Sequence, residues 1–479
     1  MYQFKTEPLK HQLTCFEASK DLPEYALLAD MGTGKSKITV DTVAYLFSTG
    51  QVDKWLCLAP NGIYKNWPNE EVPKHWPDDL YYEGSIWKEK DKRTNIPVQR
   101  RAQRDLKHSI KILFMNIEAL QYKKGQDAAK AFVDGRTIIT VDESTTIKST
   151  KAKRSKFVID LGKKSKYRRI LSGYPSPNSQ ADLYMQFNFL NPDIFGYRSF
   201  FAFRNQYCVM KTIDLGPGRP KFDKIIGPRN TEELREKMAP YSFRIKKSEC
   251  LDLPPKIYQT RHVEMSENQK RVYGDIKRDA ISILGAEKIV TVDLVLTQLI
   301  RLHQICCGFI KDDMGGVEEL DNPKLSEIKS ILEETSDKVI VWANYVHNIH
   351  QLKKELSNEY GDEDVVTYYG GSNQRERDEA IERFQRGTAK IFIANPATAG
   401  FGLTLTASST SIYFSNSYNL EHRLQSEDRN HRIGQTGSSV LYVDLIIPGT
   451  VDEKITRALI NKKKIGDNIL GDEWREWIG

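Results

Sequence analysis

The stretch Ala29-Asp30-Met31-Gly32-Thr33-Gly34-Lys35-Ser36 decides the fold, because it has the composition of a phosphate-binding loop. An apolar run at 25–28 precedes it, and residues 38–46 carry apolar side chains at helical spacing. The glycines let backbone N–H groups turn toward an anion, Lys35 adds a cation, and the Ser36 hydroxyl can bind a divalent metal ion. The strict pattern has glycine in place of Ala29. A solvated glycine-rich loop is the alternative, but the flanking strand and helix favour a nucleotide site.

The composition is that of an ordinary globular protein. The chain has 479 residues, a formal net charge of +7 and 39% hydrophobic residues. This length allows about two to four domains, and the charge permits a polyanionic partner without requiring one. The six cysteines lack the spacing of a zinc site or a disulfide framework, which indicates reduced thiols. No apolar run is long enough to span a bilayer, so we expect a cytoplasmic protein with no membrane partner.

Short apolar runs alternate with longer polar or amphipathic segments in both halves of the chain. Candidate strands lie at 55–58, 111–114, 137–141, 169–171, 339–342, 365–368, 390–393, 411–414 and 440–445. This alternation predicts mostly parallel sheets covered by helices. We therefore expect an α/β fold of two tandem lobes, with ligands bound beyond the carboxyl ends of the strands.

The pattern divides the chain into four segments. We expect residues 1–190 to form an N-terminal ATP-binding lobe and residues 256–448 to form a second lobe with a helical insertion at about 265–320. The segment 191–255 is rich in aromatic and basic residues with Gly/Pro punctuation. It is interpreted as an insertion subdomain and linker that do not continue the first sheet. Residues 449–479 form the last segment.

An acidic pair, Asp142 and Glu143, directly follows the apolar run at 137–141. In a lobe that already carries a phosphate loop, Asp142 can bind magnesium and Glu143 can position or deprotonate a water. An Asp-Glu pair by itself is more often a solvated turn or a helix N-cap. The combination with the loop favours the catalytic interpretation.

Two arginines, Arg429 and Arg432, lie in the stretch 425–435. They are three residues apart, so on a helix they would share a face, and two guanidinium groups could reach a γ-phosphate. Arginines used in this way raise the rate about 10³- to 10⁵-fold. The alternative is a surface helix with Glu/Arg pairs.

Taken in order, these motifs resemble those of the Swi/Snf-like group of superfamily-two helicase motors, which are double-stranded-DNA translocases. The matching segments are Lys10-His11-Gln12, Met31–Ser36, Leu58-Ala59-Pro60, Asn66-Trp67, Asp142–Thr145, Ser172–Pro175, Arg301–Cys307, Ala399–Thr406, Gln425–Gln435 and Gly449–Ile455. The resemblance implies two RecA-like lobes, and it implies that 449–479 contains a helix that braces them.

The resemblance also implies ATP and Mg²⁺ as cofactors. The nucleotide-binding residues would be Gln12, Met31, Gly32, Thr33, Gly34, Lys35, Ser36 and Gly402. Gln12 corresponds to the glutamine that reads adenine, and the metal ligands would be Ser36 and Asp142. The catalytic residues would be Glu143, Arg429, Arg432 and Gln425.

Basic residues gather at 148–156 and 163–169, beside two of these motifs. Such runs are often only a solvated face, but their position favours contacts to DNA phosphates, with Lys148 as one candidate. By resemblance, Asn66, Gly402 and Thr404 are further candidate DNA contacts.

The resemblance implies a DNA-dependent ATPase that moves along, or remodels, double-stranded or branched DNA. One alternative is a helicase that separates or anneals strands at forks, and another is a nucleic-acid-binding protein that binds ATP without turnover. The chain departs from the family pattern at Thr145 and Tyr174, which bear on coupling to motion rather than on hydrolysis. Because no appended module is evident, we expect a stand-alone motor of a bacterial cell or a phage-infected host rather than a nuclear remodeller. We also expect a monomer.

Overall fold

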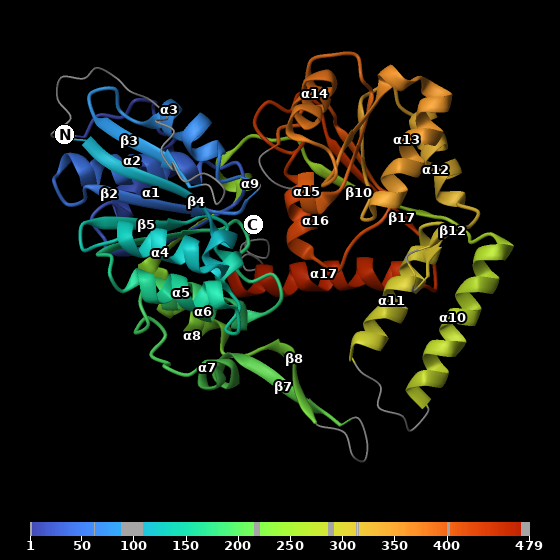
Figure 1. The fold of residues 1–479 in the computed structure, drawn as a ribbon, viewed down its shortest axis with the longest axis horizontal. Helices are drawn as coiled ribbons and strands as arrows, with labels where there is room; N and C mark the ends of the chain where they lie inside the picture. The colour runs from blue at the N-terminus through green and yellow to red at the C-terminus, as the bar shows by residue number, and fades with distance from the viewer. Residues whose placement is uncertain are drawn as a thin grey trace. The chain divides into compact units, whose positions relative to one another are not determined.

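The computed structural model describes residues 2–61, 63–87, 109–214, 221–285, 292–312, 314, 316–399 and 403–470. The chain forms two compact units (Figure 1). The first comprises Met1–Ile213, Lys221–Asp252 and Lys462–Gly479, and the second comprises Asp214–Pro220 and Leu253–Asn461. Each is built around one large sheet.

The sheet of the first unit has seven strands in the order β3-β4-β2-β5-β6-β1-β9, and all neighbouring pairs are parallel. Its strands are β1 (Glu24–Ala29), β2 (Lys54–Ala59), β3 (Tyr81–Ile86), β4 (Ser109–Asn116), β5 (Thr137–Val141), β6 (Tyr167–Leu171) and β9 (Ser242–Ile245). The central strand β5 is buried at every position, as its β-branched sequence predicts. The carboxyl ends of the strands therefore lie along one edge of this sheet.

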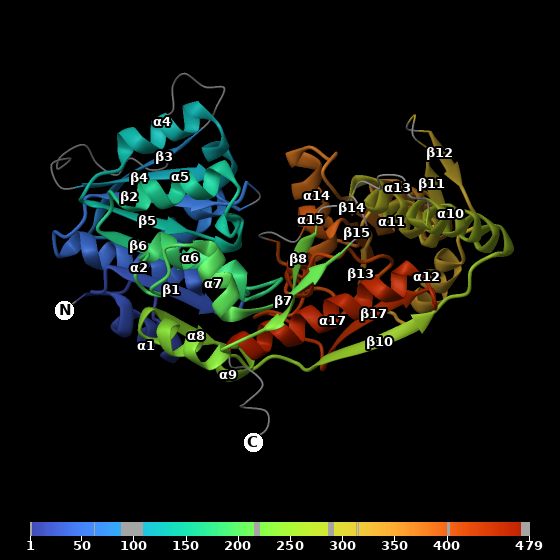
Figure 2. The same cartoon turned by 90° about the horizontal axis from the view of Figure 1, so that it is seen from below.

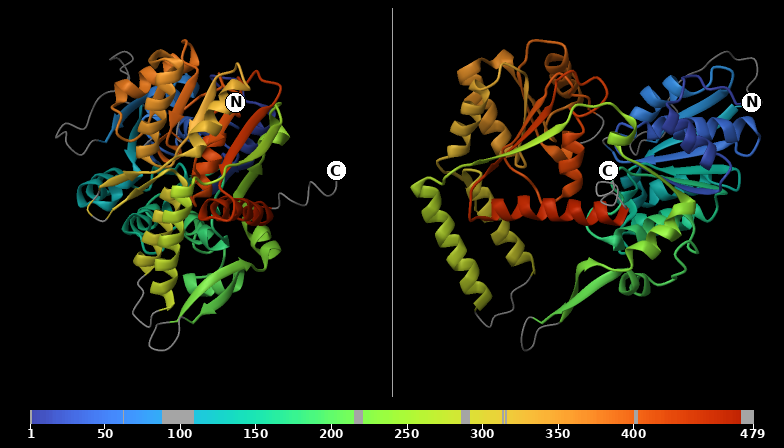
Figure 3. Two further views of the ribbon diagram at one scale, coloured as in Figure 1. Left: turned by 90° about the vertical axis from the view of Figure 1, so that its right-hand side faces the viewer. Right: turned by 180° about the vertical axis from the view of Figure 1, so that it is seen from behind.

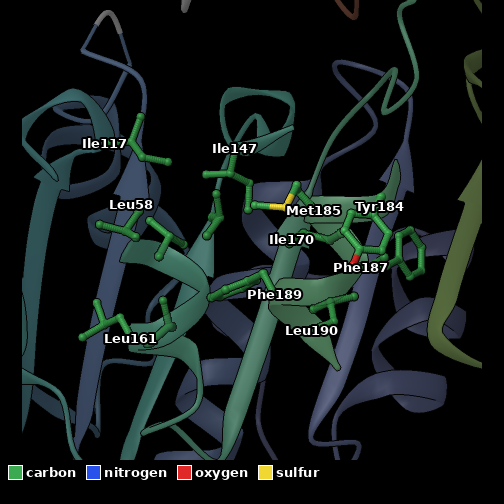
Figure 4. Packing of buried hydrophobic residues seen from close by; sticks show 14 of the residues in the cluster. Leu58, Ile117, Ile147, Leu161, Ile170, Tyr184, Met185, Phe187, Phe189 and Leu190 are labelled. Carbon is green, nitrogen blue, oxygen red and sulfur yellow. The ribbon is translucent and has the colours of Figure 1, made fainter. Parts of the chain in front are cut away.

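Helices cover both faces of this sheet (Figure 2). They are α1 (Lys10–Ser19), α2 (Lys35–Ser48), α3 (Val72–His75), α4 (Lys123–Phe132), α5 (Lys153–Gly162) and α6 (Leu183–Leu190). In β1, β2, β4, β5 and β6, alternate residues belong to different apolar clusters, since successive side chains point to opposite faces. Figure 4 shows one cluster, in which Leu161 of α5 and Phe187 of α6 pack beside Leu58 and Ile170 of the sheet.

One expectation about this unit is wrong. The segment 191–255 was expected not to continue the sheet, yet β9 pairs in parallel with β1 and forms the edge of the sheet. All four residues of β9 are only half-buried, so the strand lacks the apolar run by which buried strands are found. The rest of this segment includes α7 (Phe200–Tyr207), a hairpin of β7 (Cys208–Ile213) and β8 (Phe222–Pro228), α8 (Thr231–Met238) and α9 (Lys247–Cys250).

The sheet of the second unit has six parallel strands in the order β10-β17-β16-β13-β15-β14. Its strands are β10 (Lys256–His262), β13 (Val339–Trp342), β14 (Val365–Tyr368), β15 (Ile391–Ala394), β16 (Thr410–Tyr413) and β17 (Val440–Ile446). Two apolar clusters again divide the side chains between the faces of the sheet. The mixed α/β architecture of two parallel-sheet lobes is thus confirmed.

The helices of the second unit are drawn in yellow-green to orange-red in Figure 3. They are α10 (Glu267–Gly285), α11 (Val292–Cys306), α12 (Pro323–Glu333), α13 (Val346–Tyr360), α14 (Gln374–Gln385), α15 (Pro396–Ala399) and α16 (Leu420–Glu427), and a short hairpin pairs β11 (Phe309–Lys311) with β12 (Val317–Glu319). The last helix, α17 (Val451–Leu470), begins in the second unit, and its residues from Lys462 on belong to the first. None of the helices in the described ranges combines the length and the apolar character of a membrane span.

Candidate active site

The phosphate loop joins β1 to α2 and depends on two glycines. Gly32 has φ +81° and Gly34 has φ +92°, a left-handed conformation that costs other residues about 1–2 kcal/mol. A Cβ on Gly34 would lie 2.2 Å from Gln12 Nε2, so the position also lacks room for a side chain. The sequence thus gives the turn that presents backbone N–H groups at the N-terminus of α2.

Helix α1 holds this loop from the side. His11 Nε2 donates to the Thr33 carbonyl at 2.8 Å, and Gln12 Nε2 donates to the same oxygen at 3.0 Å. The Gln12 Oε1 accepts the backbone N–H of Leu9 at 2.9 Å. Gln12 therefore contacts the loop itself, and both ends of its amide have partners in this structure.

Lys35 is the first residue of α2 and is only 8% exposed. Its ammonium donates to the carbonyls of Ala29 at 2.7 Å and Asp30 at 3.3 Å. Ser36 follows it and is half-buried. Because carbonyl oxygens are neutral, a negatively charged phosphate can replace them as a stronger acceptor for the ammonium.

The segment around β9 fastens the base of the loop, which the sequence did not suggest. Arg244 donates to Asp30 Oδ1 at 2.8 Å and to the Leu28 carbonyl at 3.0 Å. The backbone N–H of Lys247 donates to Asp30 Oδ2 at 3.1 Å. A lone arginine in a half-buried strand carries no motif, so only the pairing of β9 with β1 identifies this contact.

Asp142 and Glu143 follow β5 at the same edge of the sheet, and both are buried. The Asp142 carboxylate accepts the Trp67 indole N–H at 3.1 Å and the backbone N–H of Glu143 at 3.0 Å. Burial raises the pKa of Asp142, although the nearby Lys35 ammonium acts in the opposite direction. Glu143 has φ +46°, which is rare for a residue with a side chain and is typical of functional sites.

These residues fit Mg²⁺. Within the described ranges, no three His, Cys, Asp or Glu side chains group as a metal cluster. Mg²⁺ does not need such a cluster, since it is usually held by one or two carboxylates together with phosphates and waters. The chemistry of the Asp142 carboxylate and the Ser36 hydroxyl agrees with that preference.

The segment Ser172–Pro175 follows β6 and lies against the phosphate loop. A Cβ on Gly173 would lie 3.2 Å from Met31 Cγ, so the two segments are in close contact. The Ser144 hydroxyl donates to Gln186 Oε1 at 2.6 Å, and Gln186 Nε2 donates to the Pro175 carbonyl at 2.6 Å. Gln186 thus joins the acidic segment to Ser172–Pro175.

The two arginines lie in the second unit and meet at one oxygen. Arg429 Nη1 and Arg432 Nη1 each donate to the Leu403 carbonyl at 3.1 Å. The expectation that they share a helical face is wrong, because α16 ends at Glu427 and both arginines lie in the turns that follow. The Arg429 carbonyl accepts the Leu405 N–H at 2.8 Å, in place of the backbone N–H that it would accept within an α-helix. We call residues 428–434 the two-arginine turn.

A buried cluster of charged residues fixes α16, which carries this turn. Arg423 donates to both oxygens of Asp444 and, at 2.8 Å, to Glu427 Oε1. Lys256 and Tyr258 of β10 donate to Glu427 Oε2 at 2.9 and 2.8 Å. The arginine motif therefore rests on a charged network that the sequence did not reveal.

The remaining candidates are more dispersed. Gln425 is fully buried in α16 and donates to Glu421 Oε1 at 3.4 Å. Thr404 is half-buried beside Leu403, and Asn66 and Lys148 are half-buried in the first unit. Gly402 lies outside the described residues.

Comparison with known proteins identifies two family domains. The SNF2-related domain matches residues 20–309, and the helicase conserved C-terminal domain matches residues 323–434. YwqA of Bacillus subtilis is 25% identical over 94% of this chain and 47% of its own length. The human DNA annealing helicase and endonuclease ZRANB3 is 26% identical over 70% of this chain and 30% of its own. A solved Sulfolobus solfataricus SWI2/SNF2 ATPase core in complex with dsDNA is 26% identical, with 99% of this chain and 95% of that chain covered and a TM-score of 0.43.

This chain spans less than half the length of these two curated relatives. The SNF2-related domain alone nevertheless covers more than half of the present sequence, and the helicase C-terminal domain follows it in order. The protein therefore belongs to the SNF2-related family of the superfamily-two helicases.

Proposed function

We propose that this protein is an ATP hydrolase that is activated by DNA and moves along, or remodels, double-stranded or branched DNA. The observation that carries the proposal is the placement of Lys35, Asp142 and Glu143 along one edge of a single parallel sheet. A cation and two carboxylates in this arrangement suit the binding and hydrolysis of a triphosphate.

Each residue has a distinct role in this proposal. Lys35 exchanges its carbonyl partners for phosphate oxygens, and the loop N–H groups bind the same anion. Ser36 and Asp142 would hold Mg²⁺, and the ion would supply positive charge to the phosphates when bound. Glu143 orients the attacking water and accepts its proton. Arg429 and Arg432 stabilise the charge of the transferring phosphoryl group.

DNA is the polymer that the sequence and its relatives favour. Exposed lysines of the basic runs at 148–156 and 163–166 supply cations, with Asn66, Lys148 and Thr404 as candidate contacts. Arg169 does not join them, since it is 1% exposed and donates to the carbonyls of Ser19, Leu22 and Pro23. The name of the human relative, a DNA annealing helicase, agrees with this choice. We also propose that the protein acts as a monomer in the cytoplasm. Sedimentation with and without DNA tests the monomer, and fractionation of the source cells tests the location.

The decisive experiment compares ATP turnover without polymer and with single-stranded DNA, duplex DNA, branched DNA and RNA at one stated salt concentration. Duplex or branched DNA should give the largest stimulation. Glu143→Gln should bind ATP normally and lose turnover, whereas Glu118→Gln, a control in the same unit, should retain both. Undiminished hydrolysis in Glu143→Gln would reject the assigned base. Wild-type protein that binds ATP without any turnover would instead be a nucleotide-binding protein.

A helicase that separates or anneals strands at forks is the second candidate, and the name of the human relative favours it. A fluorescently labelled fork and a matched blunt duplex distinguish the two functions. ATP-dependent strand separation or annealing on the fork supports this candidate. ATP-dependent displacement of a triplex strand, with the duplex left intact, supports translocation alone.

A further inference from the structure

Trp67 makes a contact that no motif assigns. It begins a helical turn at Trp67–Glu71, is 2% exposed and belongs to an apolar core cluster of the first unit. Its indole N–H nevertheless donates to Asp142 Oδ2 at 3.1 Å. A side chain that packs like a core residue thus directs its one polar atom at the carboxylate proposed to bind metal.

This contact fixes how the carboxylate is presented. Asp142 Oδ1 accepts the backbone N–H of Glu143 at 3.0 Å, while Oδ2 accepts the indole. Two donors from different segments set the plane of the group, and each oxygen keeps a lone pair for another partner. Partners of metal ligands commonly act in this way, and their removal lowers metal affinity or activity about 10- to 100-fold.

We propose that Trp67 is a positioning residue that orients Asp142 for the metal ion and links that carboxylate to the segment carrying Asn66. The inference rests on the proposed function, since it assumes that Asp142 binds metal and that Asn66 contacts DNA. Asn66 directly precedes Trp67, so a shift of this segment on DNA is transmitted to the carboxylate through one hydrogen bond.

Trp55 provides a matched control in the same cluster. Its ring meets that of Trp67 edge to face with the centroids 5.7 Å apart, and it is fully buried. Its indole N–H donates to Thr140 Oγ1 at 2.9 Å. Replacing either tryptophan removes one indole hydrogen bond from the same core, but only Trp67 contacts the carboxylate.

The test compares Trp67→Phe with Trp55→Phe. Mn²⁺ binding in the presence of ATP, followed by electron paramagnetic resonance, should weaken about 10- to 100-fold in Trp67→Phe and stay near wild type in Trp55→Phe. Both variants should lose thermal stability. If Trp67→Phe fails to fold, 3-benzothienylalanine at position 67 keeps the shape of tryptophan and removes only the N–H. Unchanged Mn²⁺ affinity in a folded variant that lacks this N–H would overturn the proposal.

The link to DNA has a separate readout. At saturating Mg²⁺, duplex DNA should raise ATP turnover by a smaller factor in Trp67→Phe than in wild type or Trp55→Phe. An unchanged factor would overturn the link to DNA and leave the metal role intact. Absence of DNA-dependent turnover in wild type would refute the proposed function, whereas the Mn²⁺ comparison needs no turnover and still decides the role of Trp67.

Discussion

The phosphate loop of the first unit is held mainly by hydrogen bonds to its backbone, whereas the two-arginine turn of the second unit follows a helix held by buried charges. His11 and Gln12 hold the loop at the Thr33 carbonyl. Arg423 holds α16 through Asp444 and Glu427, which are almost completely shielded from water. The phosphate loop and the two-arginine turn therefore differ in how they tolerate substitutions.

The difference follows from the cost of burying charge. Losing one neutral hydrogen bond costs about 1 kcal/mol, whereas removing one partner of a buried ion pair costs about 3–5 kcal/mol. Substitutions in the loop should thus affect chemistry more than folding, and substitutions beneath the two-arginine turn should do the reverse.

The largest effects are expected for two arginines of the second unit, one of which should affect turnover and the other stability. Arg432→Ala should lower DNA-stimulated turnover about 10³-fold or more, because it removes a cation that stabilises the transferring phosphoryl group. The loss of stability should be small, because the hydrogen bond that is lost is one to the neutral Leu403 carbonyl. Arg423→Met leaves Asp444 and Glu427 without their shared cation and should destabilise the unit by about 3–5 kcal/mol. Single-turnover hydrolysis and urea unfolding measure the two effects, and equal loss of stability in both variants would contradict the distinction.

Two lysines of α2 give the same contrast within the first unit. Lys35→Ala should reduce turnover about 10²- to 10³-fold, since it removes a charged donor to phosphate. Lys37 is also buried, but it donates to Asp41 Oδ2 at 2.8 Å and to the Thr6 carbonyl at 2.7 Å. Lys37→Met should lower stability and keep turnover per folded molecule. ATP hydrolysis and thermal unfolding test both variants. A stable Lys37→Met variant without activity would show that Lys37, like Lys35, is needed for catalysis.

The buried charges of the second unit should also respond to acid. Burial opposes the charged form of Asp452, but Lys324 and His303 lower the pKa of Asp452 to about 2, below its usual value of about 3.9. A lowered pKa adds stability above about pH 4, of about 2–3 kcal/mol, which is lost as the pH falls toward 2. The stability gap between wild type and Asp452→Asn in urea should therefore shrink over this range, and a constant gap would refute the assignment.

The smallest effect concerns two glycines of the first unit. Gly34 and Gly50 both have positive φ, but a Cβ on Gly50 would have nothing within 4 Å. Alanine at either position should cost about 1–2 kcal/mol of stability. Only Gly34→Ala should also displace Gln12 and weaken ATP binding about fivefold, the equivalent of one hydrogen bond. Calorimetric titration of ATP decides this, and equal affinities would show that Gln12 does not shape the loop.

The sequence predicted the elements that are buried on both faces. The run at 137–141 forms β5, and the glycines around Thr33 form the expected turn before α2. It did not predict β3, β9 or β10, because these strands are only partly buried and lack a continuous apolar run. The edge strand β14 was predicted at 365–368, because three of its four residues are buried and apolar. Hydrophobic periodicity reports burial, so it misses the strands that are largely exposed.

The candidate residues were predictable from motifs, but their supports were not. Arg429 and Arg432 were found from their local pattern, yet the helix assumed for them ends at Glu427. A backbone bond from Leu405 and the contact to Leu403 determine the turn instead. Trp67, Arg244 and Gln186 depend on partners far along the chain, which a local pattern does not reveal.

The side-chain amide of Gln186 connects the acidic segment to Ser172–Pro175, and replacing one atom of this amide would break the connection. Its oxygen accepts from Ser144, while its nitrogen donates to the carbonyls of Pro175 and Asp182. Glutamate at position 186 would have the same shape, but it would place a carboxylate oxygen beside two carbonyl oxygens. A side chain of the same shape is therefore not a sufficient replacement. The orientation of this one buried amide thus fixes the acidic segment relative to Ser172–Pro175. A shift of either segment would break one of the two hydrogen bonds that Gln186 makes between them.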